Sequence, residues 1–248
     1  LLEEIAAAVP QTLRCIVMGG GGRAGDPQLD VWLAPEGTRV PAPEYEPERP
    51  ALLIGTGGTT GKPKAVPVTH TMLEAMNLAM LGQLPEPAPP VIACATPMTH
   101  AAGIICFAVL MQGGSVVVLD GVKPAELLAS IGKHRVTRLF LPPTAIYSLL
   151  AYPDVRKYDY SSLRHFIYAA APMSVQKLRE ALEVFGPVMT QTYGQAEAPM
   201  VATIMTPAEH VEAANNPAKT HRLASAGRPS LTADVAILDP EGRMLPTG

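Results

Sequence analysis

The chain has 248 residues, of which 48% are apolar and 17% are charged, and its formal net charge at pH 7 is −3. This length and apolar content suffice for one large domain or two small ones with a buried core. The small negative charge, without any cluster of Lys and Arg, excludes a surface built to bind nucleic-acid phosphates.

The first 50 residues combine two predicted elements with two loops. Residues 1–9 predict a helix and residues 13–18 predict a strand, after which residues 20–25 formally match GxGxxG. A dinucleotide site needs a helix to open at that point, whereas Asp26-Pro27 follows. We interpret the glycine run as a loop and keep a dinucleotide-dependent oxidoreductase as an alternative. Residues 34–50, rich in Pro and Glu, predict an exposed connector.

From residue 51 onward, apolar runs of strand type alternate with segments of helical periodicity. The predicted strands are 51–54, 64–68, 91–94, 115–119, 137–141, 165–168, 188–192 and 234–238. The predicted helices are 70–81, 102–112, 124–134, 143–151 and 174–185, and residues 85–90 predict another exposed connector. This alternation predicts an α/β fold of layered sheets with mainly parallel strands, with helices between and around them.

A polar, glycine-rich loop joins the first two of these strands. It reads Thr56-Gly57-Gly58-Thr59-Thr60-Gly61-Lys62-Pro63-Lys64-Ala65. Glycines let consecutive backbone N–H groups approach an anion closely, and the hydroxyls and ammonium groups add donors and charge. The common P-loop pattern fails twice, at Thr56 and at Pro63. The residues favour a phosphate-binding loop of another kind, with a polar turn between strands as the alternative.

Three later segments place small or polar residues where predicted strands end. They are Thr96 to Gly103, Ala169 to Pro172 and Gln191 to Glu197. Taken singly, each is typical of an ordinary turn: a lone His before a helix, a strand end closed by Pro, and a solvated Glu after Tyr-Gly.

In their order along the chain, the four segments resemble the motifs of the adenylate-forming (AMP-binding) superfamily. This superfamily contains acyl- and aryl-CoA ligases, firefly-type luciferases and peptide-synthetase adenylation domains. Its motifs read TSGTTGxPKG, PxxHxxG, GGAP and YGxTE, and the resemblance runs from about residue 13 to residue 248. The chain departs from the motifs at Gly57, Ala65, Ala169, Ala170 and Ala196. By the same resemblance Arg135, Arg164 and Arg228 are interpreted as structural.

The resemblance implies a role for each matched residue. Binding of the ATP phosphates falls to Thr56, Gly57, Gly58, Thr59, Thr60, Gly61, Lys62 and Lys64. The adenine pocket falls to Ala169, Ala170, Ala171, Pro172, Thr192, Tyr193 and Gly194. The threonine of the motif is missing at position 196, which leaves two outcomes open: reduced activity, or a tolerated variation in which Thr192 takes its place. Glu197 and Thr56 would hold Mg2+, and the residues implied in catalysis are His100, Glu197, Thr56 and Lys64.

The implied reaction is ATP-dependent activation of a carboxylic acid to an acyl adenylate, followed by thioesterification to coenzyme A. Residues 96–103 contain no acidic side chain to pair with a substrate ammonium, which favours an uncharged acyl tail and a role in fatty acid metabolism. Two alternatives stay open within the resemblance. One is a degenerate homologue that binds nucleotide without adenylating an acid, and the other is a peptide-synthetase-type adenylation domain.

The ends and the charge content of the chain bear on its context. The chain begins without Met, and its charged share lies below the roughly 25% of ordinary soluble domains. We expect residues 1–248 to be an internal part of the large N-terminal domain, poorly active alone, with the smaller C-terminal domain absent. That domain and a small carboxylic acid are the expected partners, and a homodimer is left open. Three dispersed cysteines favour the reduced cytoplasm, and no apolar run is long enough to span a bilayer.

Overall fold

The computed structural model describes residues 4, 16, 18, 25–55 and 64–246. The chain divides into two units, Leu1–Tyr45 and Glu46–Gly248. In the first unit the described residues form one short helix, α2 (Leu29–Trp32). Three predictions fall on residues that lie outside the described part of the chain. They are the helix over residues 1–9 apart from residue 4, the strand over 13–18 apart from residues 16 and 18, and the glycine run apart from Gly25.

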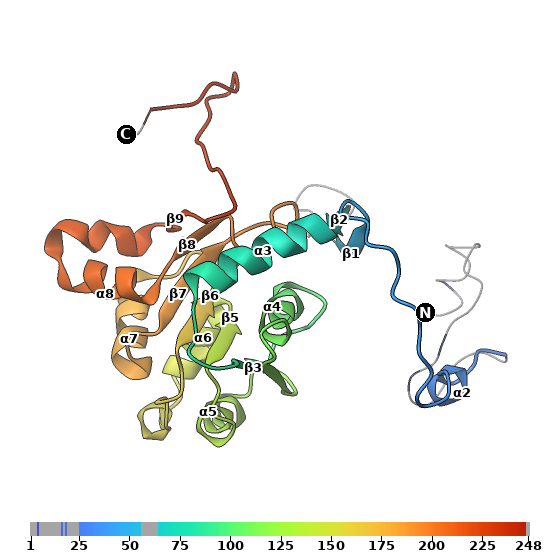
Figure 1. The fold of residues 1–248 in the computed structure, drawn as a ribbon. Helices are drawn as coiled ribbons and strands as arrows, with labels where there is room; N and C mark the ends of the chain where they lie inside the picture. Colours follow the sequence, from blue (N-terminus) through green and yellow to red (C-terminus); the bar gives the residue numbers. More distant parts are fainter. Residues whose placement is uncertain (1–3, 5–15, 17, 19–24, 56–63, 247–248) are drawn as a thin grey trace. The chain divides into compact units, whose positions relative to one another are not determined.

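A seven-stranded sheet organises the second unit (Figure 1). Its order is β4-β3-β5-β6-β7-β8-β9, where β3 is Val91–Cys94, β4 Ser115–Val118, β5 Arg138–Leu141, β6 His165–Tyr168, β7 Met189–Tyr193, β8 Thr203–Met205 and β9 Arg228–Pro229. Strands β3 to β7 pair in parallel, whereas β8 and β9 are added antiparallel at one edge. The expected α/β fold with mainly parallel strands is confirmed.

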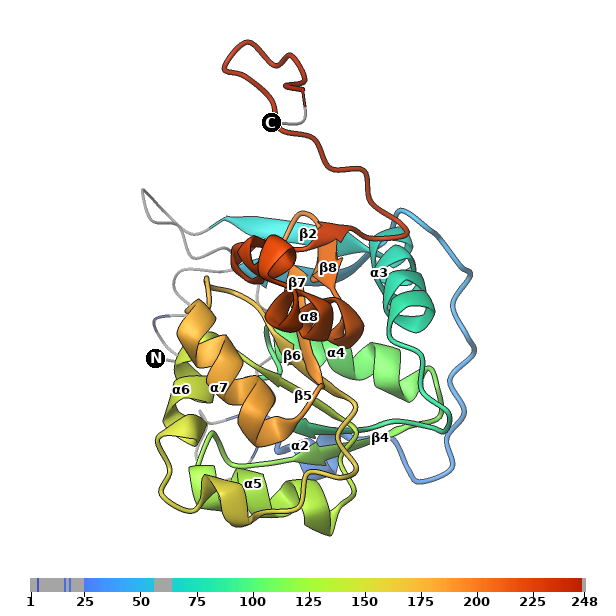
Figure 2. The ribbon, with the colours of Figure 1, turned by 90° about the vertical axis from the view of Figure 1, so that its left-hand side faces the viewer.

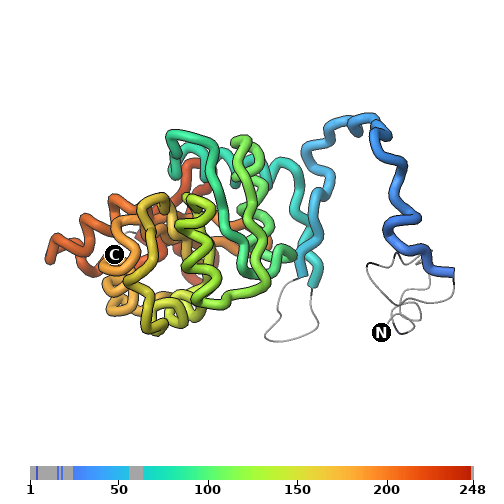
Figure 3. Tube along the Cα trace, turned by 90° about the horizontal axis from the view of Figure 1, so that it is seen from below, coloured from blue at the N-terminus to red at the C-terminus, as the bar shows by residue number. Residues whose placement is uncertain are grey.

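Helices cover both faces of this sheet (Figure 2). One buried cluster contains Leu139, Leu141 and Phe166 from the strands and packs against α5 (Pro124–Lys133), α6 (Pro143–Leu150) and α7 (Val175–Phe185). The intervening strand residues Phe140 and Ile167 face the other way, toward α3 (His70–Gln83) and α4 (Ala101–Leu110). Because successive strand side chains point to opposite faces, two-sided burial requires the continuous apolar runs seen in the sequence. Figure 3 traces the backbone through these strands and helices by residue number.

A separate hairpin precedes the sheet. Strand β1 (Pro50–Gly55) pairs antiparallel with β2 (Ala65–Thr69), with Gly55 opposite Ala65. Helix α3 begins directly after β2, and the Thr69 hydroxyl caps it by accepting a hydrogen bond from the Met72 N–H at 3.3 Å. The hairpin therefore fixes both ends of the predicted phosphate-binding loop.

The C-terminal third differs most from the expectation. Residues 234–238 form no strand, and the described backbone there contains only an isolated bridge between Leu238 and Met244. Ile237 is 70% exposed, so this apolar run has no sheet to pack against. Four elements of this third were not predicted: β8, β9, α8 (Pro207–Asn215) and the 3-10 helix η2 (Pro217–Ala224). Helix α8 buries only His210 and Ala213, so no apolar stripe marks it in the sequence.

The connector over residues 85–90 is only partly exposed. The Glu86 carboxylate, 2% exposed, pairs with the fully buried guanidinium of Arg138 on β5. Arg138 also donates to the Leu84 carbonyl at 2.9 Å. Residues 85 and 87–89 are exposed as predicted, whereas Glu86 is not, and its buried pair ties the segment after α3 to the start of β5. Among the described residues, no helix combines the length and apolar character that crossing a bilayer demands.

Candidate functional site

A pocket of about 410 Å³ lies at the carboxyl ends of β6 and β7. Its lining consists of residues Tyr168 to Met173, Gln191 to Gly194 and Leu223 to Ala226. The two strands are parallel neighbours in which Tyr168 is level with Gln191, so the segments that leave them start side by side. Ligands of open α/β sheets bind at this end of the strands. The structure thus brings two of the four predicted segments, 169–172 and 192–194, into one cavity.

Small side chains form one wall of the pocket. Ala169 is buried in the core, whereas Ala170, Ala171 and Pro172 are exposed. Ala170 has a φ of 73°, in the left-handed region that favours glycine. The backbone turns sharply here and carries only small side chains, so a flat group can lie close against it.

A further part of the lining comes from the end of β7. Tyr193 is 44% exposed, and its hydroxyl accepts a hydrogen bond from the Gln195 amide at 2.7 Å. At Gly194, an added Cβ would lie 2.5 Å from the Met200 nitrogen, so glycine is required for the next loop to pack back. The Thr192 hydroxyl is buried and has no hydrogen-bond partner among the described residues. A buried donor without a partner is costly, which fits a group that is satisfied by a bound ligand.

Glu197 lies in the loop between β7 and β8. Its carboxylate is exposed and forms no ion pair with the described residues. Met200 and Val201, just beyond it, belong to the buried cluster against which Leu52 and Ile54 of β1 pack. The loop of Glu197 and the β1–β2 hairpin therefore share one face of the sheet.

The central part of the predicted phosphate loop is not described. Thr56, Gly57, Gly58, Thr59, Thr60, Gly61 and Lys62 lie outside the described residues. Lys64 is described and lies exposed just before β2. The pairing of Thr56 with Glu197 around a metal ion thus stays a prediction.

A second cavity, of about 610 Å³, lies beside α4. His100, directly before that helix, contributes to its lining, and the His100 Nδ1 is 2.9 Å from the Thr99 hydroxyl. The remaining lining is almost entirely apolar: Leu52, Leu53, Ile54, Met98, Thr99, Gly103, Ile104, Cys106, Phe107, Leu110, Val116 and Val118. Burial, together with neighbouring Cys94, raises the pKa of Cys106 to about 12, so its thiol is protonated and unreactive.

A glycine sets the path of the chain next to His100. A Cβ added at Gly103 would lie 1.9 Å from the Met98 carbonyl oxygen. The first turn of α4 therefore packs directly on the backbone that leads to His100. This contact gives a physical reason why glycine follows His100 at the third position, as in the PxxHxxG motif.

The described residues fit magnesium bound with a nucleotide better than a metal held by protein alone. They contain no group of three His, Cys, Asp or Glu side chains that could enclose a cation. Mg2+ bound with a nucleotide needs only one or two carboxylates besides the phosphates. An exposed carboxylate such as Glu197, near a pocket with an unpartnered hydroxyl, meets that need.

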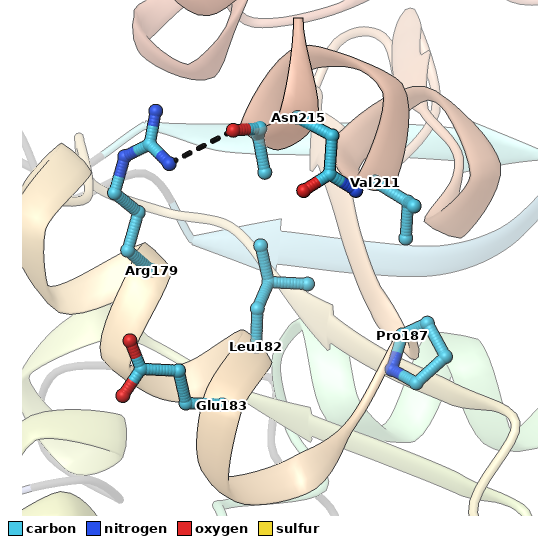
Figure 4. Close-up of a pocket in the computed structure, with 7 residues that line it drawn as sticks. Arg179, Leu182, Glu183, Pro187, Val211 and Asn215 are labelled. Atoms are coloured by element: carbon cyan, nitrogen blue, oxygen red, sulfur yellow. Dashed lines mark hydrogen bonds between the residues drawn. The ribbon is translucent and has the colours of Figure 1, made fainter.

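A third pocket, of about 320 Å³, lies between α7 and α8 (Figure 4). Arg179 crosses its edge and donates to the Ala214 carbonyl at 3.0 Å and to the Thr220 hydroxyl at 3.4 Å. The guanidinium thereby satisfies a carbonyl at the C-terminal end of α8. We assign this contact to helix capping and not to ligand binding.

Part of the first pocket was not predicted from the sequence. Leu223 to Ala226 line it, although they follow β6 by more than 50 residues in the numbering. No local pattern marks them. Tyr168 was predicted as the last residue of a strand and Gln191 as the first residue of the segment 191–197, and both line the pocket because parallel pairing brings them level.

Comparison with known proteins gives a consistent result. The family model described as AMP-binding enzyme matches residues 3–248. A medium/long-chain-fatty-acid–CoA ligase, FadD8 from Mycobacterium tuberculosis, is 38% identical over 207 residues, which cover 84% of this chain and 35% of that protein. A feruloyl-CoA synthase from Amycolatopsis sp is 30% identical over 224 residues, covering 85% of this chain and 44% of that protein.

Among solved structures, the amide bond synthetase McbA from Marinactinospora thermotolerans superposes with a TM-score of 0.83 at 30% identity. The match covers 100% of this chain and 48% of that one. The chain thus spans less than half the length of each of these three relatives.

Proposed function

The chain belongs to the AMP-binding enzyme family, and from this we propose that it carries the nucleotide- and acid-binding part of an AMP-forming acid–thiol ligase. In the first step a carboxylate attacks the α-phosphorus of ATP, which yields an acyl adenylate and pyrophosphate. In the second step the thiol of coenzyme A attacks the acyl carbon and releases AMP. The observation that carries the proposal is the pocket that joins segments 169–172 and 192–194.

The nucleotide base would occupy this pocket. Ala170, Ala171 and Pro172 offer small side chains against which a flat ring can lie, and the exposed ring of Tyr193 offers a stacking surface. The Thr192 hydroxyl can donate to an acceptor of the nucleotide.

The phosphates would be bound by the loop of residues 56–62 together with Lys64. Its N–H groups, hydroxyls and ammonium groups would neutralise the charge that repels a nucleophile. Glu197, with Thr56, would hold Mg2+, which when bound lowers the negative charge on the phosphate oxygens. No general base is required because the attacking carboxylate is already ionised at neutral pH. Positioning and electrostatics are then the main contributions of the protein.

The acid would enter beside His100. The described residues that line the cavity there include no charged carboxylate, Lys or Arg, so an uncharged aliphatic or aryl tail suits this lining, and a substrate ammonium would find no partner in it. This lining disfavours the peptide-synthetase alternative. The family match includes residues 20–25, which removes the reason to assign a separate dinucleotide site to them.

For the whole protein we propose that residues 1–248 are an internal part of the large N-terminal domain. A smaller C-terminal domain would complete the site and admit coenzyme A. The buried thiols of Cys94 and Cys106 are free, in keeping with a reducing compartment, and we propose the cytoplasm.

The direct test is exchange of labelled pyrophosphate into ATP by the full-length protein with a panel of fatty and aryl acids. We expect exchange that depends both on the acid and on Mg2+. Exchange without added acid is the control for contaminating activity. Absence of exchange across the panel, from a folded protein, would contradict the proposed ligase activity.

A degenerate homologue that only binds nucleotide is the second candidate, because Ala196 lacks the hydroxyl that the family motif carries there. A charge-assisted hydrogen bond of this kind contributes on the order of 1.5 to 3 kcal/mol. If the protein is such a degenerate homologue, the wild type binds ATP without pyrophosphate exchange, and the Ala196→Thr variant gains exchange.

A further inference from the structure

Three polar side chains form a chain of hydrogen bonds behind the nucleotide pocket. His210 on α8 is fully buried, and its Nε2 lies 2.9 Å from the hydroxyl of Tyr168, which is 1% exposed. The same hydroxyl lies 3.2 Å from the amide of Gln191 on β7. At the far end, the His210 Nδ1 lies 2.8 Å from the Thr206 carbonyl oxygen. Tyr168 and Gln191 line the pocket, whereas His210 does not.

The proton positions follow from the donors and acceptors available. A carbonyl oxygen only accepts, so the His210 Nδ1 must carry a proton. Burial lowers the pKa of His210, against a smaller opposing effect from the Thr206 carbonyl and Glu209, so the ring holds one proton at neutral pH. Nε2 is then an acceptor, and the Tyr168 hydroxyl donates to it. Burial also raises the pKa of Tyr168, which keeps that hydroxyl protonated.

This assignment determines the orientation of Gln191. The Tyr168 hydroxyl has a single proton, so it cannot donate to both His210 and the Gln191 Oε1. If the Tyr168 hydroxyl donated to Gln191 instead, His210 would have to donate from both ring nitrogens. It would then be a buried, positively charged imidazolium with no carboxylate bonded to it, which is costly. A half-turn of the Gln191 amide exchanges its oxygen and nitrogen at unchanged atomic positions. The amide N–H then faces Tyr168, and the carbonyl oxygen faces away.

We propose that His210 is a positioning residue that acts through Tyr168 to turn the carbonyl oxygen of Gln191 toward the nucleotide pocket. The inference rests on the proposed function, because it concerns how the same pocket selects its base. A carbonyl oxygen accepts from the 6-amino group of adenine, whereas it faces the 6-oxo group of hypoxanthine as acceptor against acceptor. The hydrogen-bond chain therefore favours an adenine nucleotide.

The experiment measures the dissociation constants of AMP and IMP by titration calorimetry with the full-length protein. We expect the wild type to prefer AMP. The Tyr168→Phe variant keeps the ring but frees the Gln191 amide to rotate, so the preference for AMP over IMP falls by about tenfold, the worth of one hydrogen bond. His210→Phe lowers the preference for AMP by the same factor. His210→Gln keeps a hydrogen-bond acceptor near the position of the His210 Nε2 and restores the preference in part.

Tyr160→Phe is the matched control. It removes another partly buried tyrosine hydroxyl, which donates to the Val155 carbonyl, but Tyr160 does not line the nucleotide pocket. Its preference for AMP stays at the wild-type value.

The outcomes separate the two proposals. If folded Tyr168→Phe discriminates between AMP and IMP as the wild type does, the positioning role of His210 is refuted while the proposed function stands. If the wild type binds neither nucleotide, the proposed function is refuted, and this inference with it. Should His210→Phe not fold, Tyr168→Phe decides the matter alone.

Discussion

At the scale of single residues, the position of Glu197 carries the most specific expectation. The side chain is exposed, and it makes no hydrogen bond or ion pair with other described residues. Its substitution therefore has little to disturb in the folded state, and any loss of activity reports on the ligand that it holds.

We expect Glu197→Ala to reduce pyrophosphate exchange by on the order of 100-fold or more, because a bound metal ion contributes several kcal/mol to charge stabilisation. The melting temperature should stay at the wild-type value. Glu183→Ala is the matched control, since Glu183 is also exposed and forms only a surface pair with Arg156 at 3.7 Å. Retention of exchange in Glu197→Ala would show that the magnesium assignment is wrong.

Gly103 is a residue whose role is purely steric. Alanine there would place Cβ 1.9 Å from the Met98 carbonyl oxygen, and backbone cannot move aside as a flexible side chain can. Strain of this kind typically costs about 1 to 3 kcal/mol, against a gain of about 1 kcal/mol in helix propensity.

We therefore expect Gly103→Ala to lower the free energy of unfolding in urea and to weaken acid-dependent exchange through displacement of His100. Gly132→Ala in α5 is the control, because the nearest atom to its added Cβ is the Asp159 Cβ at 3.3 Å. That variant should be close to neutral. Equal stability of the two variants would argue against direct packing of α4 on the backbone at Met98.

At the scale of elements, α8 shows how a helix without an apolar stripe is held in place. Its first turn contains a capping box: the Glu209 carboxylate accepts from the Thr206 N–H at 2.8 Å, and the Thr206 hydroxyl accepts from the Glu209 N–H at 3.4 Å. Arg228, the first residue of β9, donates to the same carboxylate at 2.7 Å. The capping box thus fixes α8 at its start and links it to β9.

The pH dependence of this capping box can be predicted. Burial alone would raise the pKa of Glu209, but the hydrogen bonds from Thr206 and the charge of Arg228 outweigh it and lower that pKa below its ordinary value. A lowered pKa means that the carboxylate stabilises the fold above the unfolded-state pKa. That contribution is lost as the pH falls through the lower, folded-state pKa.

We expect Thr206→Ala to cost about 1 kcal/mol of unfolding free energy at pH 7. Glu209→Gln should also destabilise at pH 7, and its difference from the wild type should vanish in acid. Urea titrations across the acid range measure both effects. Glu126→Gln, in the exposed first turn of α5, should show a much smaller effect. A Glu209→Gln deficit that is independent of pH would contradict the role of the charge.

Strand pairing is the other feature at this scale. Tyr168 and Gln191 are 23 residues apart in the chain, yet parallel pairing of β6 and β7 makes them neighbours. Each motif segment begins where its strand ends, so the register of the sheet aligns the segments at one edge. The candidate pocket is therefore a product of the sheet as much as of the motifs.

At the scale of the whole molecule, the second unit has one mainly parallel sheet with a helical layer on each face. Local periodicity predicted most of its strands and helices, because buried parallel strands need continuous apolar runs and the covering helices need an apolar face. The antiparallel edge escaped prediction: β8 has three residues and β9 has two, too few to show a period.

The order of the motifs along the chain was sufficient to recognise the family, because each motif is a local demand on the backbone. Gly103 and Gly194, for example, meet a neighbouring backbone segment only a few residues away. Local demands of this kind are written in adjacent residues and can be read without coordinates.

Other features arise only when distant segments fold together. The buried pair of Glu86 and Arg138 and the hydrogen bond from the Tyr168 hydroxyl to His210 join residues separated by 52 and 42 positions. The lining of the candidate pocket by Leu223 to Ala226 has the same origin. No period or spacing encodes such contacts, because they depend on which strands become neighbours and on which helix covers them. Only chain packing in three dimensions establishes that arrangement.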